Sequence, residues 1–240
     1  NVTPEIVVVK EFEEVIIPTQ NFFYLLDAGH GMKSDYSDKC GYKSVIDLTD
    51  EEDGCFMEYE FNFNVRGYLA LMLDSLNIEY KFVNPSIYYY KDDYVKDLKQ
   101  RVKFINSYKP EVDIPIVVIS IHANANSTKS VNGFEVYVPE QDFFSEQYFY
   151  PNKKEFSQRI ASEMYQSYYE VFGNEHKYNH NNKPLEENFY ILRYTEPYVI
   201  LTENEYFTNP KILPLLKTIE FQTKVATAHL LTILKLEGNK

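Results

Sequence analysis

The sequence has few cysteines and no long apolar run, and each absence excludes a class of protein. Its two cysteines, Cys40 and Cys55, are too few for a disulfide framework and lack the C-x-x-C spacing of a zinc knuckle or redox pair. A single disulfide between them, across the polar loop, is an open possibility, although free thiols are the simpler expectation. No apolar run approaches the roughly 18 residues of a membrane span, and charged residues interrupt the N-terminal segment. We therefore see no signal peptide or transmembrane helix in this sequence and expect no membrane insertion, while export stays open.

Positive charge is also scarce. The chain carries 24 Lys and Arg against 36 Asp and Glu, which gives a formal net charge of −12 at pH 7. Proteins that bind nucleic acid cluster their basic residues against phosphates, and the sequence has no long basic run, so we expect no nucleic-acid partner. Hydrophobic residues make up 44% of the 240 positions. A chain of this length and composition can bury the core of one large domain.

Apolar residues that recur every three or four positions predict helices, and continuous β-branched runs predict strands. The predicted helices span residues 58–76, 95–108 and 154–172, with further helical segments in 212–236. The predicted strands span residues 21–26, 80–83, 114–121, 133–138, 189–193 and 198–202. Two polar stretches, 32–56 and 173–188, are predicted to be surface loops.

The order of these elements predicts the fold. Strands alternate with helices, which is typical of a mainly parallel sheet, and the run at 114–121 is apolar throughout, as in a strand covered on both faces. We therefore predict an α/β fold, a single domain with a twisted, mostly parallel central sheet flanked by helices on both faces. Residues 21–240 form its main part, and short runs at 5–9 and 15–17 predict that residues 1–20 add edge strands packed on the same domain.

Three predicted strands lead into a residue that can bind a metal or transfer a proton. His30 follows the first strand and stands between two glycines, which allow the backbone to turn tightly. His122 ends the apolar run at 114–121, and Glu203 follows the strand at 198–202. Because the carboxyl ends of parallel strands open on one rim of the sheet, we expect these three residues to converge there.

A carboxylate beside this rim would complete a metal site. Glu58 and Glu60 stand in the first turn of a predicted helix, where the helix dipole also favours a carboxylate for capping alone. Two histidines and one glutamate form a His₂Glu set, which leaves a fourth position open on zinc, as hydrolytic sites require. Imidazole and carboxylate ligands together favour zinc over magnesium or calcium.

The other candidate residues carry weaker signals. His176 and His180 are spaced like two ligands on one helix face, but the Asn-rich sequence around them predicts a loop. His229 lies in the C-terminal helical segment. Ser120 stands near His122, yet no Gly-x-Ser-x-Gly elbow surrounds any serine, so a strand-end hydrogen bond is the simpler expectation. Arg101 is expected to be a surface or salt-bridged residue.

Four motifs make the sequence similar to a known family. They are LDAGHG at 26–31, EYEFNF at 58–63, SIHANA at 120–125 and ENEYFTN at 203–209. In this order they resemble the zinc-dependent N-acetylmuramoyl-L-alanine amidases of the amidase-3 type, over about residues 22–236. The resemblance implies that His30, Glu58 and His122 bind zinc and that Glu203 is the catalytic carboxylate.

Three positions affect how the family's motifs are matched to residues of this sequence. Glu60 competes with Glu58 for the ligand role, and we prefer Glu58 because the family's spacing fits Glu58, Phe61 and Asn62. Glu205 stands where the family usually has a glycine, two residues after the catalytic glutamate. Asn77 replaces a common glycine after the helix, and asparagine tolerates the left-handed conformation needed there.

The resemblance implies hydrolysis of the amide bond between N-acetylmuramic acid and L-alanine, with peptidoglycan as the partner and a monomeric enzyme acting at the bacterial cell wall or periplasm. A single catalytic domain without wall-binding repeats favours a phage endolysin, host-cytoplasmic before lysis. Two alternatives stay open. One is a zinc carboxypeptidase acting on stem peptides, and the other is a non-catalytic wall-binding or virion module on the same fold.

Overall fold

A computed structural model describes residues 20–31, 44–46, 55–83, 94–142, 150–174, 176 and 179–238. The edge strands predicted within residues 1–20 lie outside the described residues, as do Cys40 and the side chain of His180. Cys55 is disulfide-bonded, and the described residues include no free cysteine. The expectation of a free thiol is therefore wrong for Cys55.

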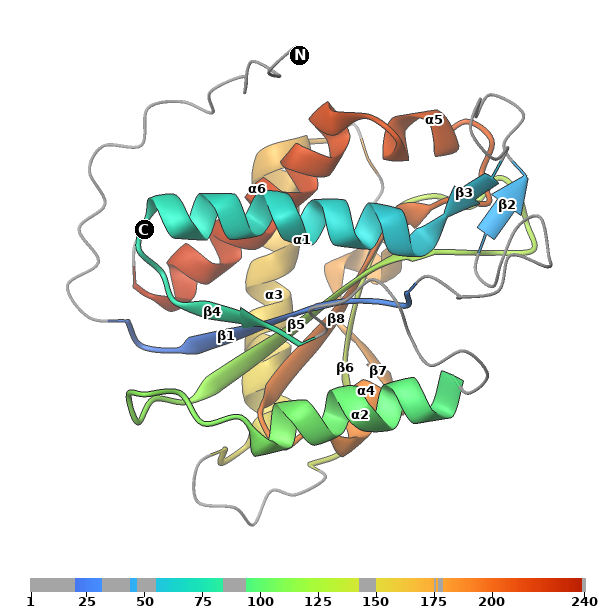
Figure 1. Cartoon of the computed structure of the whole chain (residues 1–240). Coiled ribbons are helices and arrows are strands. Elements are labelled where there is room, and N and C mark those ends of the chain that lie inside the picture. The colour runs from blue at the N-terminus through green and yellow to red at the C-terminus, as the bar shows by residue number, and fades with distance from the viewer. Residues whose placement is uncertain are drawn as a thin grey trace, which may run out of the picture.

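The centre of the molecule is a six-stranded sheet with the strand order β4-β1-β5-β8-β6-β7 (Figure 1). All neighbours run parallel except β6 and β8, which are antiparallel. The strands are β1 (Phe23–Ala28), β4 (Tyr80–Phe82), β5 (Ile116–Asn124), β6 (Phe134–Pro139), β7 (Leu185–Glu187) and β8 (Tyr198–Tyr206). A separate antiparallel pair joins β2 (Ser44–Ile46) to β3 (Cys55–Met57).

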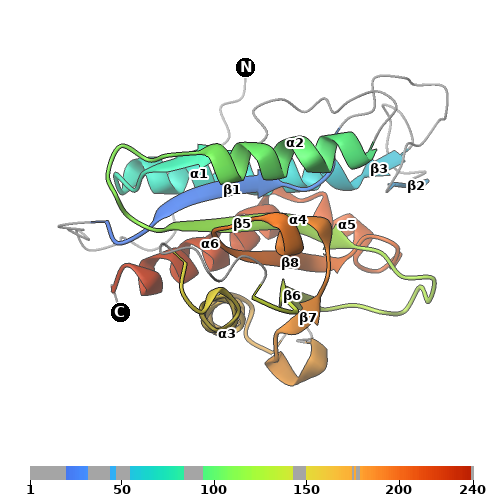
Figure 2. The same cartoon turned by 90° about the horizontal axis from the view of Figure 1, so that it is seen from below.

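Helices cover both faces of this sheet. One face packs against α1 (Glu58–Ser75), α3 (Lys153–Phe172) and α6 (Ile219–Leu236), whose buried side chains share one core cluster. The opposite face packs against α2 (Tyr94–Ser107) and α4 (Tyr190–Tyr194), with a second cluster. Figure 2 views the molecule from the side of α2 and α4, which lie nearest the viewer. The short elements α5 (Leu213–Leu216) and η1 (Asn179–Asn182) lie in connections. The predicted α/β architecture is confirmed.

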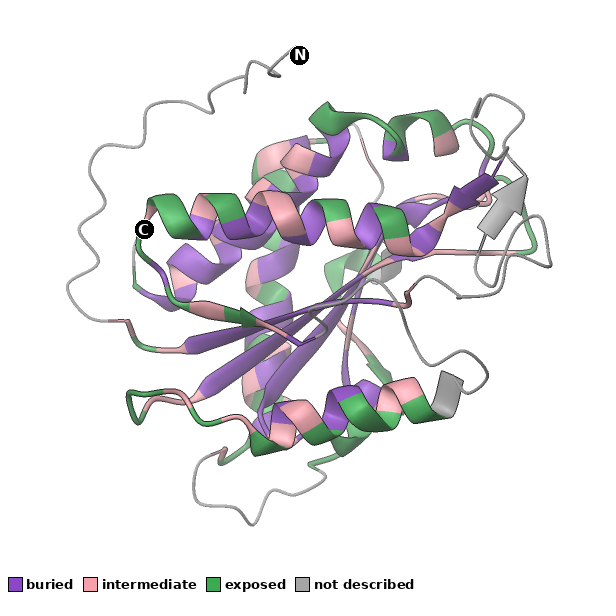
Figure 3. Cartoon of the chain, viewed as in Figure 1, coloured by how far each residue is buried: buried purple, intermediate pink, exposed green. Residues whose placement is uncertain are grey.

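The central strands are buried on both sides, as their continuous apolar runs predict (Figure 3). Alternate residues of β5 enter opposite clusters, because successive side chains of a strand point to opposite faces. Val117 and Ile119 contact the cluster under α1, α3 and α6, whereas Val118 belongs to the cluster under α2 and α4. The residues of β5 and β8 that are not buried lie in the second half of each strand: His122 and Asn124 in β5 and Glu203 in β8.

Two connections differ from the sequence-based expectation. The segment 189–193, predicted to be a strand, forms helix α4, in which the amide of Arg193 donates to the carbonyl of Phe189 at 2.9 Å. A run this short cannot separate a strand from a buried helical turn by periodicity. The stretch 173–188, predicted to be a loop, contains η1 and β7, and a three-residue strand is too short to display alternation. Asn77 adopts a φ of 54°, as expected after α1.

Candidate metal centre and active site

Two histidines and one glutamate meet at the carboxyl end of the sheet. His30 follows β1, Glu58 begins α1, and His122 lies near the end of β5. His122 Nδ1 lies 3.0 Å from Glu58 Oε1, and His30 Nε2 lies 3.3 Å from Glu58 Oε2. One ligand atom from each residue falls within 4.8 Å of the others, which is close enough for a single metal ion to contact all three.

The backbone around His30 makes this approach feasible. His30 itself has a φ of 59°, so the chain turns through the left-handed region directly after β1. A β-carbon added to Gly29 would lie 2.0 Å from Cε1 of His122, so only glycine leaves room for that imidazole. The amide nitrogen of Asn62 donates to the carbonyl of Gly29 at 2.9 Å and to Glu58 Oε1 at 3.3 Å. Asn62 therefore ties α1 to the turn that carries His30.

The pKa shifts of Glu58 and His122 favour the protonation states that metal ligands need. Burial raises the pKa of the Glu58 carboxyl, but the charge of His30 and hydrogen bonds from both imidazoles outweigh it, so the pKa lies below its ordinary value. Burial lowers the pKa of His122, opposed by its hydrogen bond to Glu58. Metal ions bind ionised carboxylates and neutral imidazoles, and this donor set suits zinc better than magnesium or calcium. The residues therefore fit a zinc ion.

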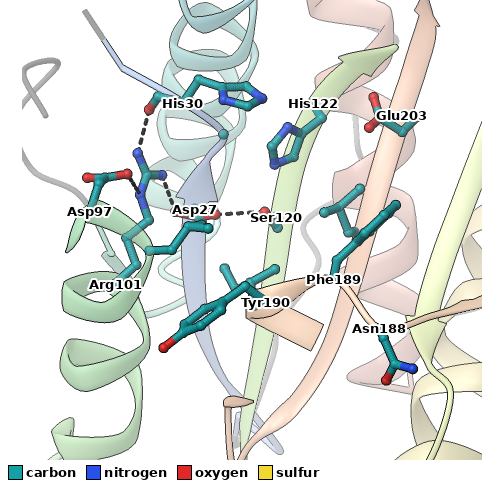
Figure 4. A pocket seen from close by; sticks show the side chains of 14 residues that line it. Asp27, His30, Asp97, Arg101, Ser120, His122, Asn188, Phe189, Tyr190 and Glu203 are labelled. Carbon is teal, nitrogen blue, oxygen red and sulfur yellow. Dashed lines mark hydrogen bonds and ion pairs between the residues drawn. The ribbon is translucent and has the colours of Figure 1, made fainter. Parts of the chain in front are cut away.

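Glu203 lies beside His122 on the neighbouring strand. The two residues are register partners in the parallel pairing of β5 with β8, and both line the same cavity (Figure 4). Across the antiparallel pairing of β8 with β6, Glu203 faces Glu135. The Glu135 carboxylate accepts hydrogen bonds from the hydroxyls of Tyr137 at 2.6 Å and Tyr206 at 2.7 Å. Glu135 is thus a second buried carboxylate at this edge, held in place by its neighbours.

A buried arginine fixes the turn that carries His30. Nη1 of Arg101 donates to Asp27 Oδ1 at 2.8 Å and to the carbonyl of Ala28 at 2.6 Å, and Nη2 donates to the carbonyl of His30 (Figure 4). Its Nε donates to Asp97 Oδ2 at 2.8 Å. Burial lowers the pKa of Arg101, but the two aspartates outweigh it and raise the pKa above its ordinary value. Arg101 therefore stays charged and clamps the turn.

Arg101 is ion-paired, as one of the two sequence-based expectations predicted. It is also buried and reaches across to β1, which the sequence did not predict. A signal was present, because Arg101 stands at helical spacing between Leu98 and Ile105 on the apolar face of α2. A cation on an apolar face requires buried partners.

The remaining candidates lie apart from the cluster. Glu60 is exposed and accepts from the hydroxyl of Tyr59 at 3.2 Å, so Glu58 is the glutamate between the histidines. His229 is buried in α6, accepts from the hydroxyl of Thr202 at 3.0 Å and donates to the Val225 carbonyl at 2.8 Å. Ser120 donates to Asp27 Oδ2 at 2.7 Å, which is the predicted strand-end hydrogen bond.

Glu205 occupies a strained and buried position. Its φ is 69°, and the register between β5 and β8 shifts next to it, between His122 and Asn124. Oε2 accepts from the Gly133 amide at 2.7 Å, and His176 Nδ1 lies 2.8 Å from Oε1. Left-handed backbone favours glycine, which gives a physical reason for the family's usual residue here. The buried Glu205 and the half-buried His176 form a pair outside the cavity that Glu203 lines.

The fold and this cluster together define an α/β protein with a candidate mononuclear metal centre at the edge of its sheet. The family model described as N-acetylmuramoyl-L-alanine amidase (Amidase_3) matches residues 25–235. The chain therefore belongs to this family, and its enzyme class is that of peptidoglycan amidases. No curated protein sequence matches it.

Several solved structures share the fold. The catalytic domain of CwlV from Bacillus (Paenibacillus) polymyxa var. colistinus is 21% identical, with a TM-score of 0.66 and coverage of 91% of this chain and 99% of that one. CwlD from Clostridioides difficile, solved with the GerS lipoprotein, is 20% identical, with a TM-score of 0.67 and coverage of 92% and 100%. The catalytic domain of the CD27L endolysin, which targets Clostridia Difficile, is 17% identical, with a TM-score of 0.57 and coverage of 89% and 97%.

Proposed function

We propose that this protein is a zinc-dependent amidase that hydrolyses the bond between N-acetylmuramic acid and the L-alanine of the stem peptide in peptidoglycan. The observation that carries the proposal is the meeting of His30, Glu58 and His122 within 4.8 Å, beside Glu203 on the adjacent strand. Membership of the amidase family supports the choice of amide bond.

His30, Glu58 and His122 would hold the zinc ion. Bound zinc supplies Lewis acidity, which polarises the scissile carbonyl and makes water acidic enough to ionise near neutral pH. The chain's own residues keep the ligand set in place. Asn62 and Arg101 fix the turn at His30 from opposite sides of the sheet, through the hydrogen bonds to Gly29 and His30.

Glu203 has the role of general base and then general acid. Its carboxylate accepts a proton from the water that attacks the carbonyl carbon, and then delivers this proton to the amide nitrogen of the departing alanine. The C–N bond breaks, so the products are a lactyl carboxyl group on the sugar and a stem peptide with a free amino group. Proton transfer of this kind contributes about 10²- to 10⁴-fold to the rate.

The test combines zinc content with peptide release from purified sacculi, using Glu203→Gln and His122→Ala. We expect wild-type protein to hold one zinc ion per chain and to release stem peptides. Glu203→Gln should keep the zinc and lose activity by at least about 100-fold, whereas His122→Ala should lose both. Full activity in Glu203→Gln would show that another group transfers the proton, and no zinc in active wild-type protein would overturn the metal assignment.

The two alternatives give different outcomes in the same experiment. A zinc carboxypeptidase would release single terminal amino acids from the stem peptide and leave the amide at the lactyl group intact. A non-catalytic wall-binding or virion module would bind sacculi without releasing any peptide. The intact His₂Glu set with an adjacent carboxylate argues against the second alternative, because a binding module has no use for it.

We further propose a place of action. The similarity to the CD27L catalytic domain supports an endolysin, a phage enzyme that degrades the host wall. The disulfide at Cys55 supports action outside the reducing cytosol, at the cell wall or periplasm. Within the described residues, no helix has the length and apolarity to cross a bilayer. We propose a monomer whose residues 21–240 form the catalytic domain.

A further inference from the structure

The cavity beside the metal cluster extends over the face of the sheet that α2 and α4 cover. Its volume is about 410 Å³, within the range of about 300–1,000 Å³ that is usual for ligand pockets. Ser120 and Leu201 contribute from the strands, and Asp97, Leu98 and Arg101 contribute from α2. The opposite wall is formed by the segment that leads into α4, which the sequence alone had assigned to a strand.

Aromatic side chains dominate this opposite wall. Phe189 and Tyr190 both line the cavity, and Phe189 keeps 40% of its surface exposed. The Phe189 ring packs against Tyr137, with ring centroids 5.1 Å apart, and the ring centroids of Tyr190 and Tyr194 lie 4.5 Å apart. Figure 4 shows the Phe189 ring on the side of the cavity where His122 and Glu203 lie. A supported aromatic face beside a catalytic edge is a surface that a ligand can cover.

The charges around the cavity disfavour an anionic occupant. Among the described residues that line it, Arg101 is the only lysine or arginine. Its guanidinium group is neutralised by ion pairs with Asp27 and Asp97, both at 2.8 Å. Glu203 adds a further carboxylate. A stem peptide carries carboxyl groups of its own, and the only lysine or arginine among these lining residues is already ion-paired, whereas a neutral sugar needs no such partner.

We propose that Phe189 and Tyr190 form a glycan subsite that stacks against a sugar ring of the substrate, so that the cavity receives the glycan strand and not the stem peptide. The C–H groups on one face of a pyranose carry a small positive charge and pack on the negative face of an aromatic ring. The carboxylate of Asp97 offers an acceptor for sugar hydroxyl or acetamido groups. The inference rests on the proposed function, because the substrate amide joins a sugar to a peptide.

Two soluble substrates with the same scissile bond separate the sugar from the peptide. The first is a disaccharide-peptide fragment of peptidoglycan, and the second is a lactoyl-peptide that keeps the amide but lacks both sugars. Phe189→Ala removes the stacking face, and Phe189→Tyr keeps it. Tyr169→Ala is the matched control, because Tyr169 is 51% exposed on α3, on the opposite side of the sheet.

We expect Phe189→Ala to raise the KM for the disaccharide-peptide about tenfold and to change its kcat by less than about twofold. The same variant should hydrolyse the lactoyl-peptide as wild-type protein does, and Phe189→Tyr and Tyr169→Ala should resemble wild type on both substrates. An equal loss on both substrates would show that Phe189 supports the site or binds peptide. No loss on either substrate would also overturn the subsite.

A binding measurement distinguishes failure of this inference from failure of the proposed function. Titration of the disaccharide alone, followed by protein NMR, should perturb wild-type protein and require about tenfold more ligand in Phe189→Ala. If wild-type protein cleaves neither substrate but binds the disaccharide through Phe189, the amidase assignment fails and the subsite stands. If it cleaves the disaccharide-peptide and Phe189→Ala binds the disaccharide as tightly, the subsite fails and the amidase stands.

Discussion

Gly29 and His122 approach each other so closely that a methyl group on Gly29 would lie 2.0 Å from the imidazole ring. Rotating the ring away from Gly29 would cost free energy, because its Nδ1 contacts Glu58 Oε1 at 3.0 Å. Gly29→Ala should therefore displace a zinc ligand without removing one. We expect zinc affinity to fall by about 10- to 100-fold, measured by competition with a chelator.

Gly67→Ala provides the control for that substitution. Gly67 lies within α1, and an added β-carbon would meet no atom within 4 Å. The variant should bind zinc as wild type does and gain about 0.5–1 kcal/mol in unfolding free energy, because alanine restricts the unfolded chain and favours helix. Equal zinc affinities in Gly29→Ala and Gly67→Ala would show that the close approach is not required for the site.

The clamp formed by Arg101 predicts a joint loss of stability and metal affinity. Lysine keeps the charge but cannot reproduce the donors that reach Asp27, Asp97 and the carbonyl of His30 at once. Arg101→Lys should destabilise the fold by about 1–3 kcal/mol, because buried acceptors lose their donors, and should weaken zinc binding. Chemical denaturation and chelator competition measure the two effects. Arg159→Lys, at an exposed position of α3, should change neither. Wild-type zinc affinity in Arg101→Lys would contradict the clamp.

The positive φ of Glu205 predicts that glycine is more stabilising than alanine at this position. Glu205→Ala and Glu205→Gly both leave the amide of Gly133 and the imidazole of His176 without this carboxylate. Only alanine also retains the cost of a left-handed backbone at a φ of 69°. The glycine variant should therefore be more stable than the alanine variant by about 1–2 kcal/mol. Equal unfolding free energies in urea would show that the backbone is not strained at Glu205.

His229 predicts a loss of stability in mild acid. Burial lowers its pKa from 6.5 to about 4, opposed by the hydrogen bond to the carbonyl of Val225. Between these values the unfolded chain binds a proton that the folded chain excludes, so stability falls as the pH falls from 6.5 to about 4. The penalty at the acid end is about 3 kcal/mol. His229→Gln should flatten this part of the curve of unfolding free energy against pH, and an unchanged slope would contradict the assignment.

Much of this arrangement could be predicted from the sequence, because the signals are local. Apolar runs that lead into His30, His122 and Glu203 mark the strands, and the parallel topology then brings these residues to one rim, although β5 and β8 continue past His122 and Glu203 to Asn124 and Tyr206. The phase of apolar residues after Glu58 agrees with its buried position in α1. These patterns depend only on residues that are close in sequence, so they can be recognised without knowledge of the fold.

The features that could not be predicted depend on contacts distant in sequence. Arg101 reaches residues more than 70 positions away, and its partners become apparent only when α2 lies across β1. The φ of Glu205 follows from a register shift between two strands. The aromatic wall at Phe189 was assigned to a strand, because five residues carry too little periodicity to identify a helix.

Identifying the bond that is cut tests the proposed amidase activity. Purified sacculi are digested with zinc-loaded protein, and the soluble products are analysed by mass spectrometry with and without labelling of new amino groups. If the protein is this amidase, the products are intact stem peptides whose newly labelled residue is the N-terminal L-alanine, together with glycan strands that keep their lactyl groups. Release of single terminal amino acids, or of sugar-bearing fragments with the amide intact, would contradict it.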